Sequence, residues 1–169
     1  MNWLAWLSLS LAAFAGCSDP VHDQRVAALG PEVDGVVPGP LHRPGQPCGA
    51  CHGDEGPADP IFSLSGTVYR ASDGEQPLFG VTVRAIDSSG AQYATTTNCA
   101  GNFYVTPDQF TPSWPIWLKV EYGATSAEMR SVASREGSCA ACHDGDPSPH
   151  SAGRVFLDTT EVPDRGGCE

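Results

Sequence analysis

Two pentapeptides of the form CxxCH, at residues 48–52 and 139–143, constrain this chain more than any other feature. In each, two cysteines lie three positions apart and a histidine follows the second, the spacing used for covalent haem attachment. Each thiol can form a thioether with a haem vinyl group, and the histidine can then bind the iron. The motifs therefore predict two covalent haems (haem c), held by Cys48, Cys51 and His52, and by Cys139, Cys142 and His143.

Two alternatives use the same four cysteines differently. The thiolates could form one split zinc site, or the cysteines could form two small-loop disulfides. Neither alternative explains why a histidine follows each second cysteine. The paired motifs instead resemble those of dihaem c-type cytochromes, and this resemblance implies a one-electron carrier with no catalytic residues.

The N-terminus contains an apolar run over residues 3–15 that leads into Gly16 and Cys17. The run is too short for a transmembrane helix and resembles a bacterial lipoprotein signal. The resemblance implies that residues 1–16 are removed and that Cys17 is lipidated, with Ser18 after it favouring an outer-membrane anchor. The alternative is an ordinary cleaved secretory signal that leaves Cys17 free. Both interpretations export the chain.

The remaining cysteines allow one disulfide. Of the 7 cysteines, one is assigned to lipid and four to haem, which leaves Cys99 and Cys168. In an oxidising compartment these two are candidates for a disulfide, and two unrelated free thiols are the alternative.

The net charge of -11 bears on partners. It argues against nucleic acid and against an anionic membrane surface, and it favours a redox partner protein with a basic docking face. Contact with a membrane would come through the lipid anchor. The alternative is that acidity only keeps an exported protein soluble.

The organisation of the mature chain follows from its turn residues and its alternating segments. Residues 17–46 are rich in proline and glycine and predict a tether without sustained helical periodicity, followed by a haem-binding β-sandwich over residues 47–169. Period-two alternation predicts seven strands. They are expected near residues 64–69, 80–86, 92–97, 102–106, 116–122, 126–133 and 153–157, with inward faces at Leu64/Val68, Val81/Val83/Ala85, Phe103/Val105 and Ile116/Leu118/Val120.

Residues 64–106 carry a second resemblance. The steps Gly66-Thr67-Val68, Asp73-Gly74, Gly80-Val81 and Gly101-Asn102-Phe103 resemble the carboxypeptidase regulatory-like domain. That resemblance implies a transthyretin-like, immunoglobulin-like sandwich without an active site of its own.

The segments after the two CxxCH motifs are similar in sequence. Each motif leads into a Gly/Asp/Pro loop and then into a strand, beginning near Ser65 in one case and near Gly153 in the other. Seven strands running alternately up and down would make the first and last strands parallel, so both haems are expected at one end of the sandwich. The alternative places the second motif in a mobile loop, far from the first.

A haem that only carries electrons needs a second axial ligand. His42 and His150 are the preferred candidates, because both lie in loops close in sequence to a motif, while His22 lies deep in the tether. Met129 falls on an expected strand, where methionine is more often core filler than a ligand. An exposed loop histidine without any role is the alternative for both candidates.

Two other functions compete with electron transfer. One is a surface binding or adhesion module in which the CxxCH motifs serve as zinc or disulfide staples. The other is a haem enzyme such as a peroxidase, which would need one haem with an open distal side.

Overall fold

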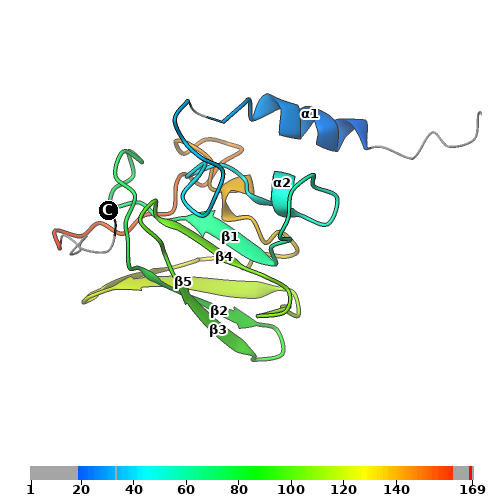
Figure 1. Cartoon of the computed structure of the whole chain (residues 1–169). Coiled ribbons are helices and arrows are strands. Elements are labelled where there is room, and N and C mark those ends of the chain that lie inside the picture. The colour runs from blue at the N-terminus through cyan, green and yellow to red at the C-terminus, as the bar shows by residue number, and fades with distance from the viewer. Residues whose placement is uncertain (1–18, 33, 162–167, 169) are drawn as a thin grey trace, which may run out of the picture. The chain divides into compact units, whose positions relative to one another are not determined.

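The computed structural model describes residues 19–32, 34–161 and 168 (Figure 1). The chain divides into two compact units, residues 1–30 and 31–169, which are described separately.

The described part of the first unit is a helix, α1 (Pro20–Ala28). Asp19 caps it by accepting hydrogen bonds from the backbone nitrogens of Val21 (2.9 Å) and His22 (3.2 Å). Gly30 ends it with a φ of 70°, which glycine adopts without strain. The expectation of a tether without helix was wrong here. The capping signals are local, and the helix buries no residue, so no apolar period revealed it.

The second unit contains two antiparallel sheets. In the smaller, β1 (Leu64–Thr67) pairs with β4 (Asn102–Val105). The larger has the order β3-β2-β5-β6, formed by β2 (Thr82–Asp87), β3 (Gln92–Thr96), β5 (Ile116–Tyr122) and β6 (Thr125–Glu128). The unit is mainly β with few helices, consistent with a β-sandwich (Figure 1).

One apolar core joins the two sheets. Along β2 the side chains alternate, so that Val83 and Ala85 are buried while Arg84 is exposed. The smaller sheet contributes Leu64 and Phe103 to the same cluster. The inward faces expected from the sequence are therefore confirmed, with Leu118 only partly buried. The core comprises Leu64, Val68, Leu78, Val81, Val83, Ala85, Phe103, Val105, Ile116, Val120 and Leu157.

The described residues form six strands instead of the expected seven. Residues 153–157 make only a bridge from Phe156 to Tyr69. Gly153 has a φ of 80°, so the extended backbone begins too late for a longer ladder. The bridge is parallel, which is the direction expected for the first and last segments.

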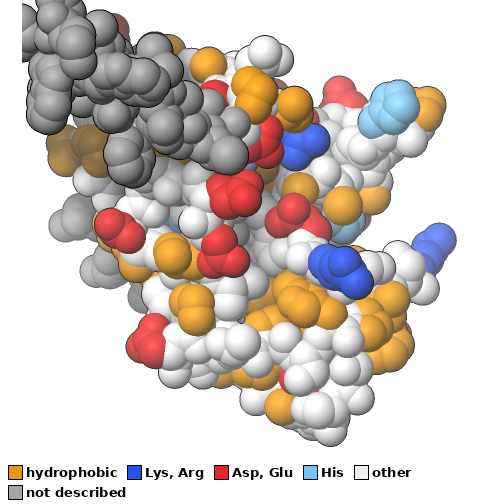
Figure 2. All heavy atoms as spheres, turned by 90° about the vertical axis from the view of Figure 1, so that its right-hand side faces the viewer, with side chains coloured by type: hydrophobic (Ala, Val, Ile, Leu, Met, Phe, Trp, Pro, Cys, Tyr) orange, Lys and Arg blue, Asp and Glu red, His pale blue; other side chains and the backbone are white. Residues whose placement is uncertain are grey.

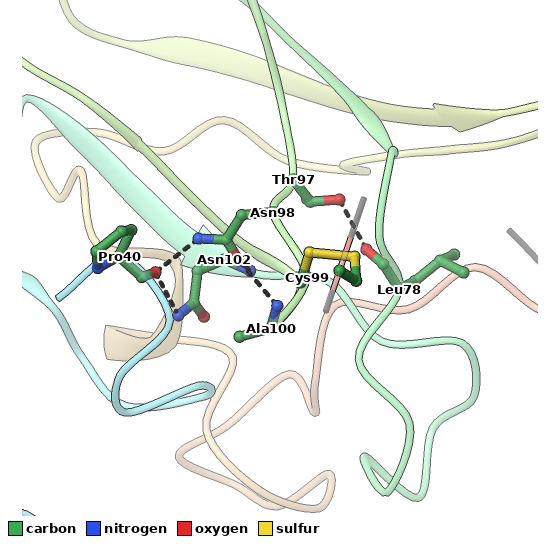
Figure 3. Close-up of a disulfide and its surroundings, with 8 residues drawn as sticks. Pro40, Leu78, Thr97, Asn98, Cys99, Ala100 and Asn102 are labelled. Carbon is green, nitrogen blue, oxygen red and sulfur yellow. Dashed lines mark hydrogen bonds between the residues drawn. A yellow bond between two sulfur atoms is a disulfide. The ribbon is translucent and has the colours of Figure 1, made fainter. Parts of the chain in front are cut away.

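A disulfide joins Cys99 and Cys168, the pair left over by the cysteine count, with their Cα atoms 5.4 Å apart (Figure 3). On the same turn, the side-chain amide of Asn98 donates to the Pro40 carbonyl (2.6 Å), and that of Asn102 donates to the His42 carbonyl (2.9 Å). Residues 40–42, expected within the tether, are therefore bound to the turn before β4.

Candidate functional site

The two CxxCH motifs adopt similar tight turns. The first forms the short helix α2 (Gly49–His52), and the second forms the 3-10 turn η2 (Cys139–Ala141). In each, the backbone nitrogen of the histidine donates to the oxygen of the first cysteine at 2.8 Å, from His52 to Cys48 and from His143 to Cys139. One turn thus places both cysteines and the histidine of each motif close together.

Both motifs pack against β1. The Ser65 side chain lies beside the Cys48 thiol, and the Ser65 backbone bridges to Ser138 beside the second motif. The next residue, Gly66, lies against Cys139, since a Cβ at position 66 would come within 2.8 Å of the Cys139 Cβ. The first motif also contacts the residue that precedes the second, because a Cβ at Gly49 would come within 3.0 Å of the Ser138 Cβ. Motifs far apart in the sequence are therefore neighbours in the fold.

The two motif histidines make the same hydrogen bond. Nδ1 of His52 lies 2.8 Å from the carbonyl oxygen of Pro60, and Nδ1 of His143 lies 2.7 Å from that of Gly153. A carbonyl oxygen only accepts, so each Nδ1 carries the hydrogen. Each Nε2 is then left with its lone pair, and a histidine whose Nδ1 donates to a carbonyl in this way is a common form of metal ligand.

The loop after each motif returns to it in the same way. The Ala58 nitrogen donates to the Cys51 oxygen at 2.9 Å, and the Ala152 nitrogen donates to the Cys142 oxygen at 2.8 Å. These hydrogen bonds close the loops that carry the accepting carbonyls of Pro60 and Gly153. The sequence similarity between the two motif regions is therefore also a structural similarity.

All four motif cysteines are free thiols in this structure. Burial, and after it the nearby Cys48, raises the pKa of the Cys139 thiol to about 12. Burial likewise raises the pKa of Cys48. Cys142 is exposed. Over the residues that the structure describes, no three His, Cys, Asp or Glu side chains are grouped to hold a metal ion.

His42 lies beside the first motif. Its ring centroid is 6.1 Å from that of His52, with the ring planes at 71°. Its Nδ1 lies 3.0 Å from Oε1 of Glu32, which also accepts from Arg43 Nε at 2.8 Å. The bond from Arg43 holds the pKa of Glu32 below its ordinary value.

The other candidate ligands are placed differently. His150 is exposed in the 148–151 turn, and His22 lies on α1 in the first unit. Met129 follows β6, and its backbone nitrogen donates to the Leu118 oxygen at 3.0 Å. Among the described residues, His42 is the candidate whose ring lies against that of a motif histidine.

Several residues of the site are not apparent from the sequence. Glu32 and Ser65 belong to no motif, and neither does Phe62, which stacks on His52 at 4.3 Å. The carbonyls of Pro60 and Gly153 are backbone groups, which any residue type supplies. The one sequence feature that could have indicated a partner for His42 is the presence of a carboxylate, Glu32, ten residues before it.

The proposed lipidation site, Cys17, lies outside the described residues. Within the described residues, no helix has the length and apolar character needed to cross a membrane. Comparison with protein-family models, curated proteins and solved structures finds no match.

Proposed function

We propose that this protein is an exported, lipid-anchored dihaem c-type cytochrome that transfers single electrons. The observation that carries the proposal is the matched pair of Nδ1 hydrogen bonds, from His52 to Pro60 and from His143 to Gly153. A zinc or disulfide staple built only from cysteines would not need either histidine in this state. Iron ligation needs both.

The residues present suit covalent haem attachment. Each S–H group would add across a vinyl double bond, so that a carbon–sulfur bond forms and the hydrogen passes to the neighbouring vinyl carbon. The four free cysteines would supply these bonds, with Cys48 and Cys51 serving one haem and Cys139 and Cys142 the other. Bound haem would supply an iron that gains and loses one electron.

The contact between the motifs supports electron exchange between the two haems. Gly49 of the first motif lies against Ser138, next to the second. An electron entering at one haem would therefore have a short route to the other. The β-sandwich would act as a rigid support for both motifs.

Exposed carboxylates after each motif support a basic redox partner. Figure 2 shows several acidic side chains on one face of the molecule. Such a surface attracts a positively charged docking face, and added salt weakens this attraction by screening the charges. The exposed acidic residues just after the motifs are Asp54, Glu55 and Asp59, and Asp144 and Asp146.

The proposal is tested by producing the chain in a host that attaches c-type haem. Intact mass should show two haems that remain after acid–acetone extraction. Cys51→Ala and Cys142→Ala should each weaken attachment at one site, while Cys99→Ser, outside both motifs, should keep two haems. A colourless protein that holds zinc would overturn the proposal and favour a binding module with stapled loops.

A further inference from the structure

We infer that His42 is the second axial ligand of the iron bound by His52, and that Glu32 positions His42 for this role. The inference rests on the proposed dihaem function. It assigns His42 to a particular haem, which the sequence could not do, and it makes the two haems chemically different.

The separation of the two rings is the first argument. Imidazole nitrogen binds a metal at about 2 Å, and the ring centroid lies roughly 1 Å behind that nitrogen. Two imidazoles on opposite sides of one iron therefore have centroids about 6 Å apart. The His42 and His52 centroids are 6.1 Å apart. The planes of the two rings cross at 71°, so these rings are not stacked as those of His52 and Phe62 are at 4.3 Å.

The hydrogen bonding of His42 is the second argument. Its Nδ1 lies 3.0 Å from Oε1 of Glu32, and a carboxylate accepts the Nδ1 hydrogen. The lone pair is then on Nε2, as in His52. Arg43 donates to the same oxygen at 2.8 Å and so fixes the carboxylate. A histidine without a role would not need its ring held in this way.

The backbone around His42 is also fixed. Its carbonyl oxygen accepts from Asn102 at 2.9 Å, and the Gly45 nitrogen donates to the Thr67 hydroxyl at 2.7 Å. Thr67 and Asn102 are paired residues of β1 and β4. The sheet that supports both motifs therefore also holds the segment that carries His42.

The carboxylate has a consequence for the reduction potential. An imidazole that donates to a carboxylate is a stronger electron donor than one that donates to a carbonyl, and a stronger donor favours the oxidised iron. The Nδ1 partners of His52 and His143 are both carbonyls. Glu32 therefore lowers the potential of the first haem through His42.

Removal of the His42 ring tests the ligation. In dihaem protein whose haem content is verified by mass, His42→Gly should convert the low-spin signal of the first haem in electron paramagnetic resonance to high spin and leave the signal of the second haem unchanged. Added imidazole should restore the low-spin signal of the first haem. Two covalent haems with an unchanged signal would overturn the inference and leave the proposed function standing. No covalent haem in the wild-type protein would overturn both.

Glu32→Gln provides a test that does not remove a ligand. One of the two potentials should rise while the other potential and the spin state of each iron stay the same. Glu121→Gln is the matched control, because Glu121 also accepts from cations, Arg84 and Lys119, but lies on β5. Equal potentials in Glu32→Gln and wild type would refute the role of Glu32.

Discussion

Gly66 lies directly against Cys139. A Cβ added at Gly66 would come within 2.8 Å of the Cys139 Cβ and 3.0 Å of its sulfur, and within 3.0 Å of the Phe103 ring. The second motif can therefore pack this closely on β1 only because position 66 carries no side chain. This contact makes Gly66 part of the proposed haem site, although it belongs to neither motif.

Gly66→Ala should displace the second motif. The added methyl overpacks a buried position, which costs about 1 to 3 kcal/mol of unfolding free energy, and covalent haem at Cys139 and Cys142 should fall while the first site keeps its haem. Chemical denaturation and intact mass measure the two effects. Gly39→Ala is the control, since the nearest heavy atom lies 4.0 Å from the added Cβ. Equal effects of the two substitutions would contradict the steric argument.

Loss of the Cys99–Cys168 disulfide should lower stability. The bridge spans 69 residues, and the chain-entropy model assigns a loop of this length about 4 kcal/mol. The Cys99→Ser, Cys168→Ser double variant should therefore unfold at lower denaturant concentration and still carry two haems. Peptide mapping without reductant should find the linked pair in wild type. Two alkylatable thiols in the unreduced wild-type protein would refute the pairing.

Asp87 should make the free energy of unfolding fall as the pH is lowered. It accepts hydrogen bonds from Ser89, Ala91 and Ser113, with the Ser89 hydroxyl the largest cause that lowers its pKa from 3.8 to about 2. A lowered folded-state pKa stabilises the fold above pH 3.8, and this stabilisation is lost as pH falls from there toward 2.

Thermal unfolding between pH 2 and 6 measures this effect. Asp87→Asn should be less stable than wild type near neutral pH and should show a flatter acid dependence. Asp158→Asn, at an exposed position, is the control and should follow the wild-type curve. A wild-type curve that is flat from pH 2 to 5 would refute the assignment to Asp87.

Cys17→Ser should release the protein from membranes. Resemblance to a lipoprotein signal implies that the acyl chains on Cys17 are the anchor, and two or three chains bind a bilayer stably. Fractionation of cells that express each variant measures the effect. Ser18→Asp keeps the lipid and should move the protein toward the inner membrane. Membrane association that survives Cys17→Ser would count against lipid anchoring.

The sequence predicted the core better than the edges of the fold. Alternation identified Val83, Ala85 and Phe103 as inward-facing, because burial of one face imposes a period of two. Alternation also predicted a full strand over residues 153–157, where the chain forms only one bridge. The length of a strand depends on its pairing partner, which alternation does not reveal. The capped helix α1 was missed because it buries no face.

The site divides in the same way. The spacing of the cysteines and histidines in both motifs identifies them in the sequence. The position of His42 in a loop near the first motif made it a candidate ligand. The partners that orient the rings were not, because the carbonyls of Pro60 and Gly153 carry no sequence signature and Glu32 meets His42 only after the chain turns. Ligand identity is local in sequence, whereas ligand orientation depends on the fold.

The contact of both motif regions with β1 also sets an order of assembly. Ser65 reaches Cys48 across a short loop, but it reaches Ser138 only after the rest of the sandwich has intervened. Closing a longer loop has a larger entropic cost, so the contact with Cys48 forms more readily than the contact with Ser138. The first motif can therefore reach β1 early in folding, whereas the second reaches β1 only when the sandwich has closed.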